Sequence, residues 1–188
     1  MKKITVLVSA LCLIFVLVSC SAKTESFSLK TAAEQRGVSF KDACTAFGVA
    51  SDDDVEPSEE VLSVPDGVTL ADEKFNIGFI SAPSATGTVG GLQITRTSAQ
   101  TEAEDESALA LEVYDLLVEA FGEPDRPDGT SDSLYFADAE ATSLASGATG
   151  RDTWTLDDGT IVSYVAGIQN SEGEDAAVFS HMIAIGGN

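Results

Sequence analysis

The longest hydrophobic pattern in the chain has the period of an α-helix and runs from Thr101 to Phe121. Thr101 and Glu104 form a capping box at its start, and Gly122 and Pro124 end it. Six apolar residues share one face of this helix: Leu109, Val113, Leu116, Leu117, Ala120 and Phe121. A stripe of this composition is typical of a helix that covers a hydrophobic core.

A shorter helix is predicted between Ser39, a suitable N-cap, and Gly48, a suitable C-terminal stop. Its apolar face consists of Phe40, Ala43, Cys44 and Phe47. Free cysteine is among the most buried residue types, so we interpret Cys44 as a buried structural thiol rather than a nucleophile.

Alternation of apolar and polar residues predicts strands at Lys74–Ile80 and Leu92–Thr97. We expect these two strands to pair because the connection between them is local. Asp158-Gly159 fits the two-residue turn of a later hairpin. A last strand, Val178–Ile185, is expected to pair with residues 160–168.

The turn sets the predicted register of that hairpin. Pairing Asp157 with Thr160 places Trp154 opposite Ser163. One face then carries Trp154, Leu156, Ile161 and Val165, which we assign to the core. The other face carries Thr153, Thr155, Val162 and Tyr164, which we expect to be partly exposed.

Together these elements predict an α+β fold, a small antiparallel sheet with one long helix packed across it, in the order α-β-β-α-β-β-β. Residues 122–150, rich in Asp, Ser, Gly and Ala, are expected to be irregular apart from a candidate short strand at Leu134-Tyr135-Phe136. Loops of this length are usually functional or disordered. The length fits a single domain, which we assign to residues 37–188.

The first twenty residues have a different character. Met1-Lys2-Lys3 precedes an uncharged run from Ile4 to Val18, which is shorter than the roughly 20 residues of a membrane span and fits the core of a secretory signal. The run ends in Leu17-Val18-Ser19-Cys20, which resembles the lipobox of bacterial lipoprotein precursors. The resemblance implies a signal peptide at residues 1–19, a diacylglycerol thioether on Cys20, and often an N-linked acyl chain such as palmitate. An ordinary signal peptide with an incidental Cys20 is the alternative.

Two or more acyl chains hold a protein durably at a bilayer. We therefore expect a protein anchored by lipid on the extracytoplasmic side of the cell membrane. Ser21 resembles the pattern for the outer membrane if the host has two membranes. Residues 20–36 are expected to be the lipidated cysteine and a tether, within which residues 29–36 could form a short helix.

Charge restricts the possible partners. The chain has 31 Asp and Glu residues against 10 Lys and Arg, a formal net charge of −21. Nucleic acid is excluded as a default partner because phosphate binding relies on clustered basic residues. Solubility alone would account for the acidity, and attraction of cations or basic polypeptides is the alternative. No Gly-Lys dipeptide occurs, so a nucleotide-binding P-loop is absent from the sequence.

Catalytic motifs are also absent from the sequence. His181 is the only histidine, and its strand face also carries Phe179, Ile183 and Ile185. The adjacent Ser180 points the other way, so these two residues cannot form a nucleophile–base pair. A structural histidine at a sheet edge or interface is the favoured interpretation. No H-E-x-x-H, C-x-x-C, S-x-x-K or G-x-S-x-G occurs.

Two acidic loops could supply oxygen ligands to Ca²⁺. One contains Asp125, Asp128 and Asp132, and the other contains Asp52 to Asp54 with Glu56. Neither has the spacing of an EF-hand loop, and acidic loops are usually just solvated.

The leading hypothesis is a non-catalytic, lipid-anchored extracytoplasmic protein without a cofactor, which binds or scaffolds an envelope protein or peptide. Its contact surface is expected to be Thr153, Thr155 and Tyr164 together with residues 122–150. The alternative is a carboxylate-based Ca²⁺-binding module or hydrolase of the cell envelope. A protein that only stabilises a neighbouring transporter or enzyme would leave the same signature in the sequence.

Overall fold

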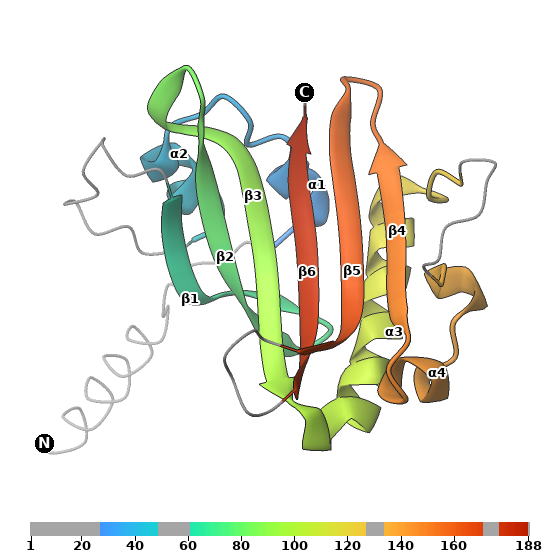
Figure 1. Cartoon of the computed structure of the whole chain (residues 1–188). Helices are drawn as coiled ribbons and strands as arrows, with labels where there is room; N and C mark the ends of the chain where they lie inside the picture. The colour runs from blue at the N-terminus through green and yellow to red at the C-terminus, as the bar shows by residue number, and fades with distance from the viewer. Residues whose placement is uncertain (1–26, 49–60, 127–133, 171–176, 188) are drawn as a thin grey trace, which may run out of the picture.

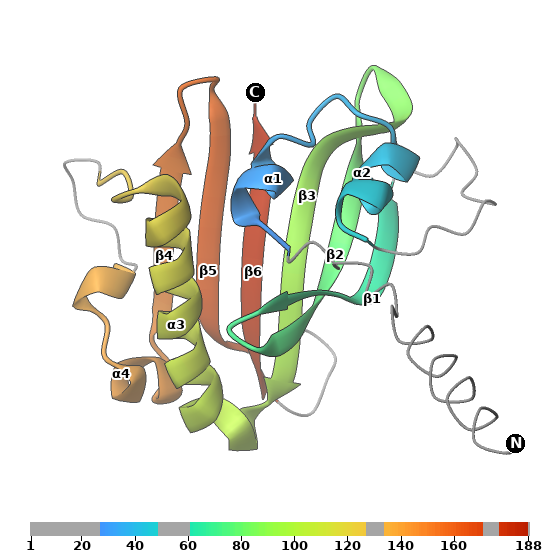
Figure 2. The ribbon, with the colours of Figure 1, turned by 180° about the vertical axis from the view of Figure 1, so that it is seen from behind.

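A computed structural model describes residues 27–48, 61–126, 134–170 and 177–187. These residues form an α+β fold in which a six-strand antiparallel sheet carries helices on one face. Figure 1 looks onto the bare face of the sheet, and Figure 2 looks onto the face that the helices cover.

The sheet is built from two three-stranded meanders that meet at β3 and β6, in the order β1-β2-β3-β6-β5-β4. Every neighbouring pair is antiparallel, and the central pair runs from Leu92 opposite Ile185 to Ala99 opposite Val178. The strands are Val61–Leu70 (β1), Glu73–Ala82 (β2), Ala85–Ala99 (β3), Thr149–Thr155 (β4), Thr160–Asn170 (β5) and Ala177–Gly187 (β6).

The described helices lie on one side of this sheet (Figure 2). They are α1 (Leu29–Ala33), α2 (Phe40–Ala46), α3 (Ala103–Phe121) and α4 (Ala141–Ala145), with the 3₁₀ turns η1 (Gln100–Glu102) and η2 (Phe136–Asp138). η1 runs directly into α3, so the two form one helical segment of 22 residues. The core lies between this segment and the sheet, where Leu109, Val113 and Leu117 of α3 are buried as the stripe predicts.

Several sequence predictions are confirmed. β2 pairs with β3 and β5 pairs with β6, as the alternation indicates. α2 begins after Ser39, whose hydroxyl accepts a hydrogen bond from the Asp42 backbone N–H at 3.1 Å. Cys44 in this helix is fully buried.

The predicted element order is wrong in that it lacks β1 and the short helix α4. In β1, Asp66 interrupts the apolar alternation of Leu62, Val64, Val68 and Leu70, and the register shifts between Val64 and Val68. Pro65 is tolerated there because β1 is an edge strand with a bulge.

The predicted boundary between tether and domain is also too late in the chain. Leu29 and Ala32 of α1 are buried, and Arg36 donates a hydrogen bond to the Thr160 hydroxyl at 3.2 Å. The part of residues 20–36 that the structure describes therefore belongs to the folded domain.

Two predictions about the long helix and its C-terminal connection fail as well. No side chain caps α3 at Glu102, because η1 occupies the turn in which Thr101 and Glu104 would have formed the capping box. The described part of residues 122–150 is not simply irregular, since it contains η2 and α4, and bridges from Asp125 to Thr153 and from Leu134 to Gly150 tie it to β4. The expected strand at 134–136 is reduced to the single bridge at Leu134.

Candidate functional site

A polar network lies under α3, within the otherwise apolar core. The Glu106 carboxylate accepts hydrogen bonds from Arg96 at 2.8 to 3.1 Å and from the Ser98 hydroxyl at 2.6 Å. His181 Nε2 lies 2.8 Å from the second carboxylate oxygen, and His181 Nδ1 lies 3.0 Å from the Tyr164 hydroxyl. Glu106 is 4% exposed, His181 1% and Tyr164 0%.

The charges of this network follow from its contacts. Burial by itself would raise the pKa of Glu106, but the hydrogen bonds from Arg96 and Ser98 outweigh it and hold that pKa below its usual value. Burial lowers the pKa of His181, so its imidazole is neutral. Because an ionised carboxylate only accepts, Nε2 of His181 carries the proton and Nδ1 accepts from Tyr164.

The arrangement resembles a proton relay, but its members are closed to a substrate. Tyr164 and His181 are buried between α3 and the sheet, and the Tyr164 hydroxyl also contacts the Ala110 carbonyl at 3.3 Å. The network joins β3, β5 and β6 to α3 and fixes their relative positions. His181 is buried in this network, and β6 is a central strand rather than the sheet edge that the sequence favours.

A second buried carboxylate, Asp152 of β4, is only partly paired. One oxygen accepts from the Phe136 backbone N–H at 2.9 Å, and the other, Oδ1, has no hydrogen-bond partner. Burial raises the pKa of Asp152, since the hydrogen bond from Phe136 does not compensate for the lost hydration of the charged form.

The predicted hairpin register is wrong by one residue, which changes the candidate contact surface. Thr155 pairs with Ile161 and Trp154 with Val162, because the turn holds three residues and Gly159 adopts a φ of +81°. A slip of one residue exchanges the two faces of a strand. Tyr164 therefore lies in the core and is not a surface contact, whereas Thr153 and Thr155 lie on the bare face of the sheet.

The bare face, here called the open face, consists of the alternate residues of five strands that point away from the helices. These alternate residues run from Asn76 to Ile80, from Gly91 to Ala99, from Val178 to Gly186, from Ile161 to Gln169 and from Thr149 to Thr155. In the described chain no helix covers them, as Figure 1 shows.

The open face carries no acidic residue, although 31 of the 188 residues in the chain are Asp or Glu. Within these ranges its one charged residue is Arg151, on the edge strand β4, and Lys74, the preceding outward residue of β2, borders the face. The centre is the pair Met182 and Val165, both partly exposed, and most surrounding positions are Thr, Ser, Gly, Gln or Ala. An ordinary soluble surface has about 25–35% charged residues, so this face differs from the rest of the molecule.

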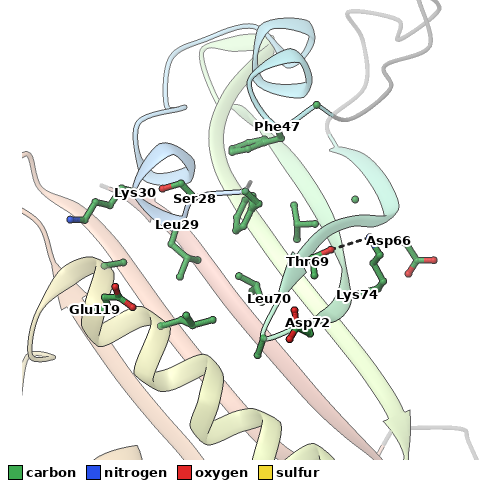
Figure 3. A pocket seen from close by; sticks show the side chains of 17 residues that line it. Ser28, Leu29, Lys30, Phe47, Asp66, Thr69, Leu70, Asp72, Lys74 and Glu119 are labelled. Carbon is green, nitrogen blue, oxygen red and sulfur yellow. Dashed lines mark hydrogen bonds between the residues drawn. The ribbon is translucent and has the colours of Figure 1, made fainter. Parts of the chain in front are cut away.

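A groove of about 960 Å³ lies on the opposite, helical side of the sheet (Figure 3). Its floor is apolar and its rim carries both signs of charge, including Lys30, Lys74, Asp72 and Glu119. Its apolar lining comes from α1, α2, α3 and the β1–β2 hairpin: Phe27, Leu29, Phe47, Val68, Leu70 and Leu116.

One wall of the groove is a conformationally demanding turn. Leu70 pairs with Glu73, and the two residues between them, Ala71 and Asp72, have φ angles of +46° and +63°. The left-handed region favours glycine and asparagine, so this turn holds a less suited sequence.

The predicted calcium loops receive no support from the described residues. Asp125 is exposed, whereas Asp128, Asp132 and Asp52 to Glu56 lie outside the described ranges. Among the residues that the structure places, no three His, Cys, Asp or Glu side chains come together as a metal-binding group. Within the same ranges, no helix has the length and hydrophobicity to cross a bilayer.

Comparison with known proteins finds no matching family model, no matching curated protein and no matching solved structure.

Proposed function

We propose that this chain is a lipid-anchored, non-catalytic extracytoplasmic protein that contacts another protein of the cell envelope through its open face. The observation that carries this proposal is the absence of Asp and Glu from that face in a chain of net charge −21.

The composition of the open face suits a protein–protein contact. The cores of such interfaces are depleted of charged residues, because a charge buried without a partner loses its hydration. A solvated sheet face has no such restriction and normally admits Lys and Glu. Thr153 and Thr155 keep their role as candidate contact residues on this face, whereas Tyr164 loses it.

The anchor is assigned to Cys20 on the strength of the lipobox. Phe27, the first described residue, lies seven positions after Cys20, so the intervening chain spans at most about 25 Å when extended. The chain enters the domain beside α1, on the helical side of the sheet. The open face lies on the other side of the sheet and is free of this entry point.

The anchor is tested by metabolic labelling with palmitate followed by mass spectrometry of the mature protein. We expect label on the wild type, cleavage before residue 20, and neither in a Cys20→Ser variant. A mature protein with an unmodified Cys20 would contradict the assignment.

The contact surface is tested by photo-crosslinking in intact cells. A photoreactive residue at Thr155, which is exposed on the open face, should give a protein adduct. The same residue at Ala137, which is exposed on η2 outside the open face, is the matched control. Equal adducts at both positions, or none at Thr155, would count against the proposal.

The competing assignment, a Ca²⁺-binding module, is tested by calorimetry with Ca²⁺ on the same mature protein. We expect neither heat of binding nor a shift in melting temperature. Saturable heat that is lost on Asp125→Asn would favour the metal-binding alternative.

A further inference from the structure

We infer that the partner on the open face is a second copy of this chain, with the two sheets packed face to face. The inference rests on the proposed contact role of the open face and adds the identity of the partner.

The size of the face matches what a stable dimer requires. Strands lie about 4.8 Å apart and rise about 3.4 Å per residue, so five strands and about eight residues give a face of roughly 24 by 27 Å. This is about 650 Å² in projection, close to the about 800 Å² per partner of a standard specific interface. Two sheets of this kind pack with their mean planes about 10 Å apart.

The charge distribution selects a second copy over a basic partner. A basic protein would be drawn to the acidic surfaces of this molecule and would gain nothing from an uncharged face. Two copies, each of net charge −21, repel through every acidic surface and approach with least repulsion through their open faces.

A two-fold axis is compatible with the residues of the face. An axis along β6 places Met182 near its own copy and brings Arg151 of one molecule over β2 of the other. Arg151 is level with Asn76 across the sheet, so its guanidinium faces the uncharged Asn76 of the other copy, with Lys74 as the next outward position of that strand. The contact is then isologous and closes at two subunits. Anchoring in one membrane would raise the effective concentration of the two copies.

The inference predicts an unusual salt dependence. Because the long-range interaction between two acidic copies is repulsive, added salt should screen it and strengthen the dimer. A contact with a basic partner would weaken under the same conditions. The sign of the salt effect therefore separates the two kinds of partner.

Cysteine crosslinking in native membranes is the first test. Cys44 is fully buried and Cys20 is assigned to lipidation, so Met182→Cys introduces the one accessible thiol. A short bis-maleimide should link this variant into a species of twice the monomer mass. Ala137→Cys, exposed outside the open face, should stay monomeric.

Sedimentation velocity of the detergent-solubilised full mature chain is the second test. We expect a monomer–dimer equilibrium whose Kd decreases with salt. Met182→Glu should raise this Kd at least about tenfold, because it places a charge at the centre of the interface, whereas Ala137→Glu should leave it unchanged. Thr95 pairs with Met182 across β3 and β6, so Thr95→Glu is a second variant in case Met182→Glu does not fold.

The outcomes separate the two proposals. If Met182→Cys is crosslinked into a product of a different mass while the wild type sediments as a monomer, the partner is not a second copy. The open face would then remain a contact surface for another protein. A monomer at every concentration, with no adduct at position 182, would overturn both.

Discussion

Replacing Glu106 by Gln should destabilise the fold strongly, because this carboxylate is the centre of the buried network. It accepts from Arg96, Ser98 and His181 in a site where Glu106 itself is 4% exposed. Hydrogen bonds to charged groups contribute about 1.5–3 kcal/mol each, and desolvation offsets much of that sum. Breaking a buried pair costs about 3–5 kcal/mol.

We expect the lower end of that range, about 3 kcal/mol. The Arg96 side chain is 22% exposed and keeps a second partner, Glu73 Oε2, at 3.1 Å. The total stability of a domain is about 5–15 kcal/mol, so the variant would lose a large part of it while remaining folded in water.

Trp154 provides the assay. It is the only tryptophan in the chain, is 2% exposed, and donates its indole N–H to the Gly122 carbonyl at 2.8 Å. Urea unfolding followed by its fluorescence should give a lower midpoint for Glu106→Gln with an unchanged slope.

A double-mutant cycle with Arg96 sharpens the prediction. The double variant Arg96→Leu/Glu106→Leu should be more stable than Glu106→Leu alone, because Arg96→Leu removes a guanidinium charge that has lost its main partner, Glu106. A Glu106→Gln variant within about 1 kcal/mol of wild type, or additive losses in the cycle, would refute the reasoning.

Three further changes test other parts of the structure by the same urea assay. Asp152→Asn should raise the free energy of unfolding by about 1 kcal/mol at neutral pH, because the amide removes a charge that burial disfavours and keeps an acceptor for the Phe136 N–H. Burial raises the pKa of Asp152, so the stabilisation that wild type gains from a protonated Asp152 is lost as pH rises through the pKa of the folded state. The advantage of Asp152→Asn over wild type should therefore shrink on acidification, and an advantage independent of pH would contradict this. His181→Gln should make the free energy of unfolding less dependent on pH below about 6.5. The pKa of His181 is lowered in the folded protein, so the stability that the neutral imidazole contributes is lost as pH falls through the pKa of the folded state. If the stability of the variant and of wild type fell in parallel with pH, His181 would not be the source of this pH dependence. Ala71→Asn with Asp72→Gly should add about 1 kcal/mol, since both positions have positive φ; no gain would mean that the turn is not strained.

Local patterns predicted the helical stripe of α3 and the pairing of β2 with β3 and of β5 with β6. These elements depend on periodicity over neighbouring residues, which the sequence displays directly. β1 escaped prediction because Asp66 and the bulge around it break the alternation, and only its pairing with β2 reveals it as a strand.

The candidate surface depended on a single turn residue. A two-residue and a three-residue loop at Asp158-Gly159 differ by one position in register, and that position decides which face holds Tyr164. The hydrogen bond from the Leu156 N–H to the Thr160 carbonyl at 2.8 Å fixes the outcome, and the sequence does not contain it.

The buried network leaves a trace in the sequence. Glu106 extends the apolar stripe of α3 at three residues before Leu109. Arg96 shares its strand face with Leu92 and Ile94, just as His181 does with Phe179. Charged or titratable residues on the core-facing sides of α3, β3 and β6 indicate that these residues meet in the core. The distances between them follow only from the fold.

Protection of the open face in the native envelope tests the central claim most directly. Thr97→Cys, exposed on β3, and Ala137→Cys, exposed on η2, should react with a maleimide at similar rates in dilute purified protein. In intact membranes the account predicts that Thr97→Cys is labelled several-fold more slowly, while Ala137→Cys keeps its rate. Equal labelling of the two positions in membranes would contradict the assignment of the open face as a contact surface.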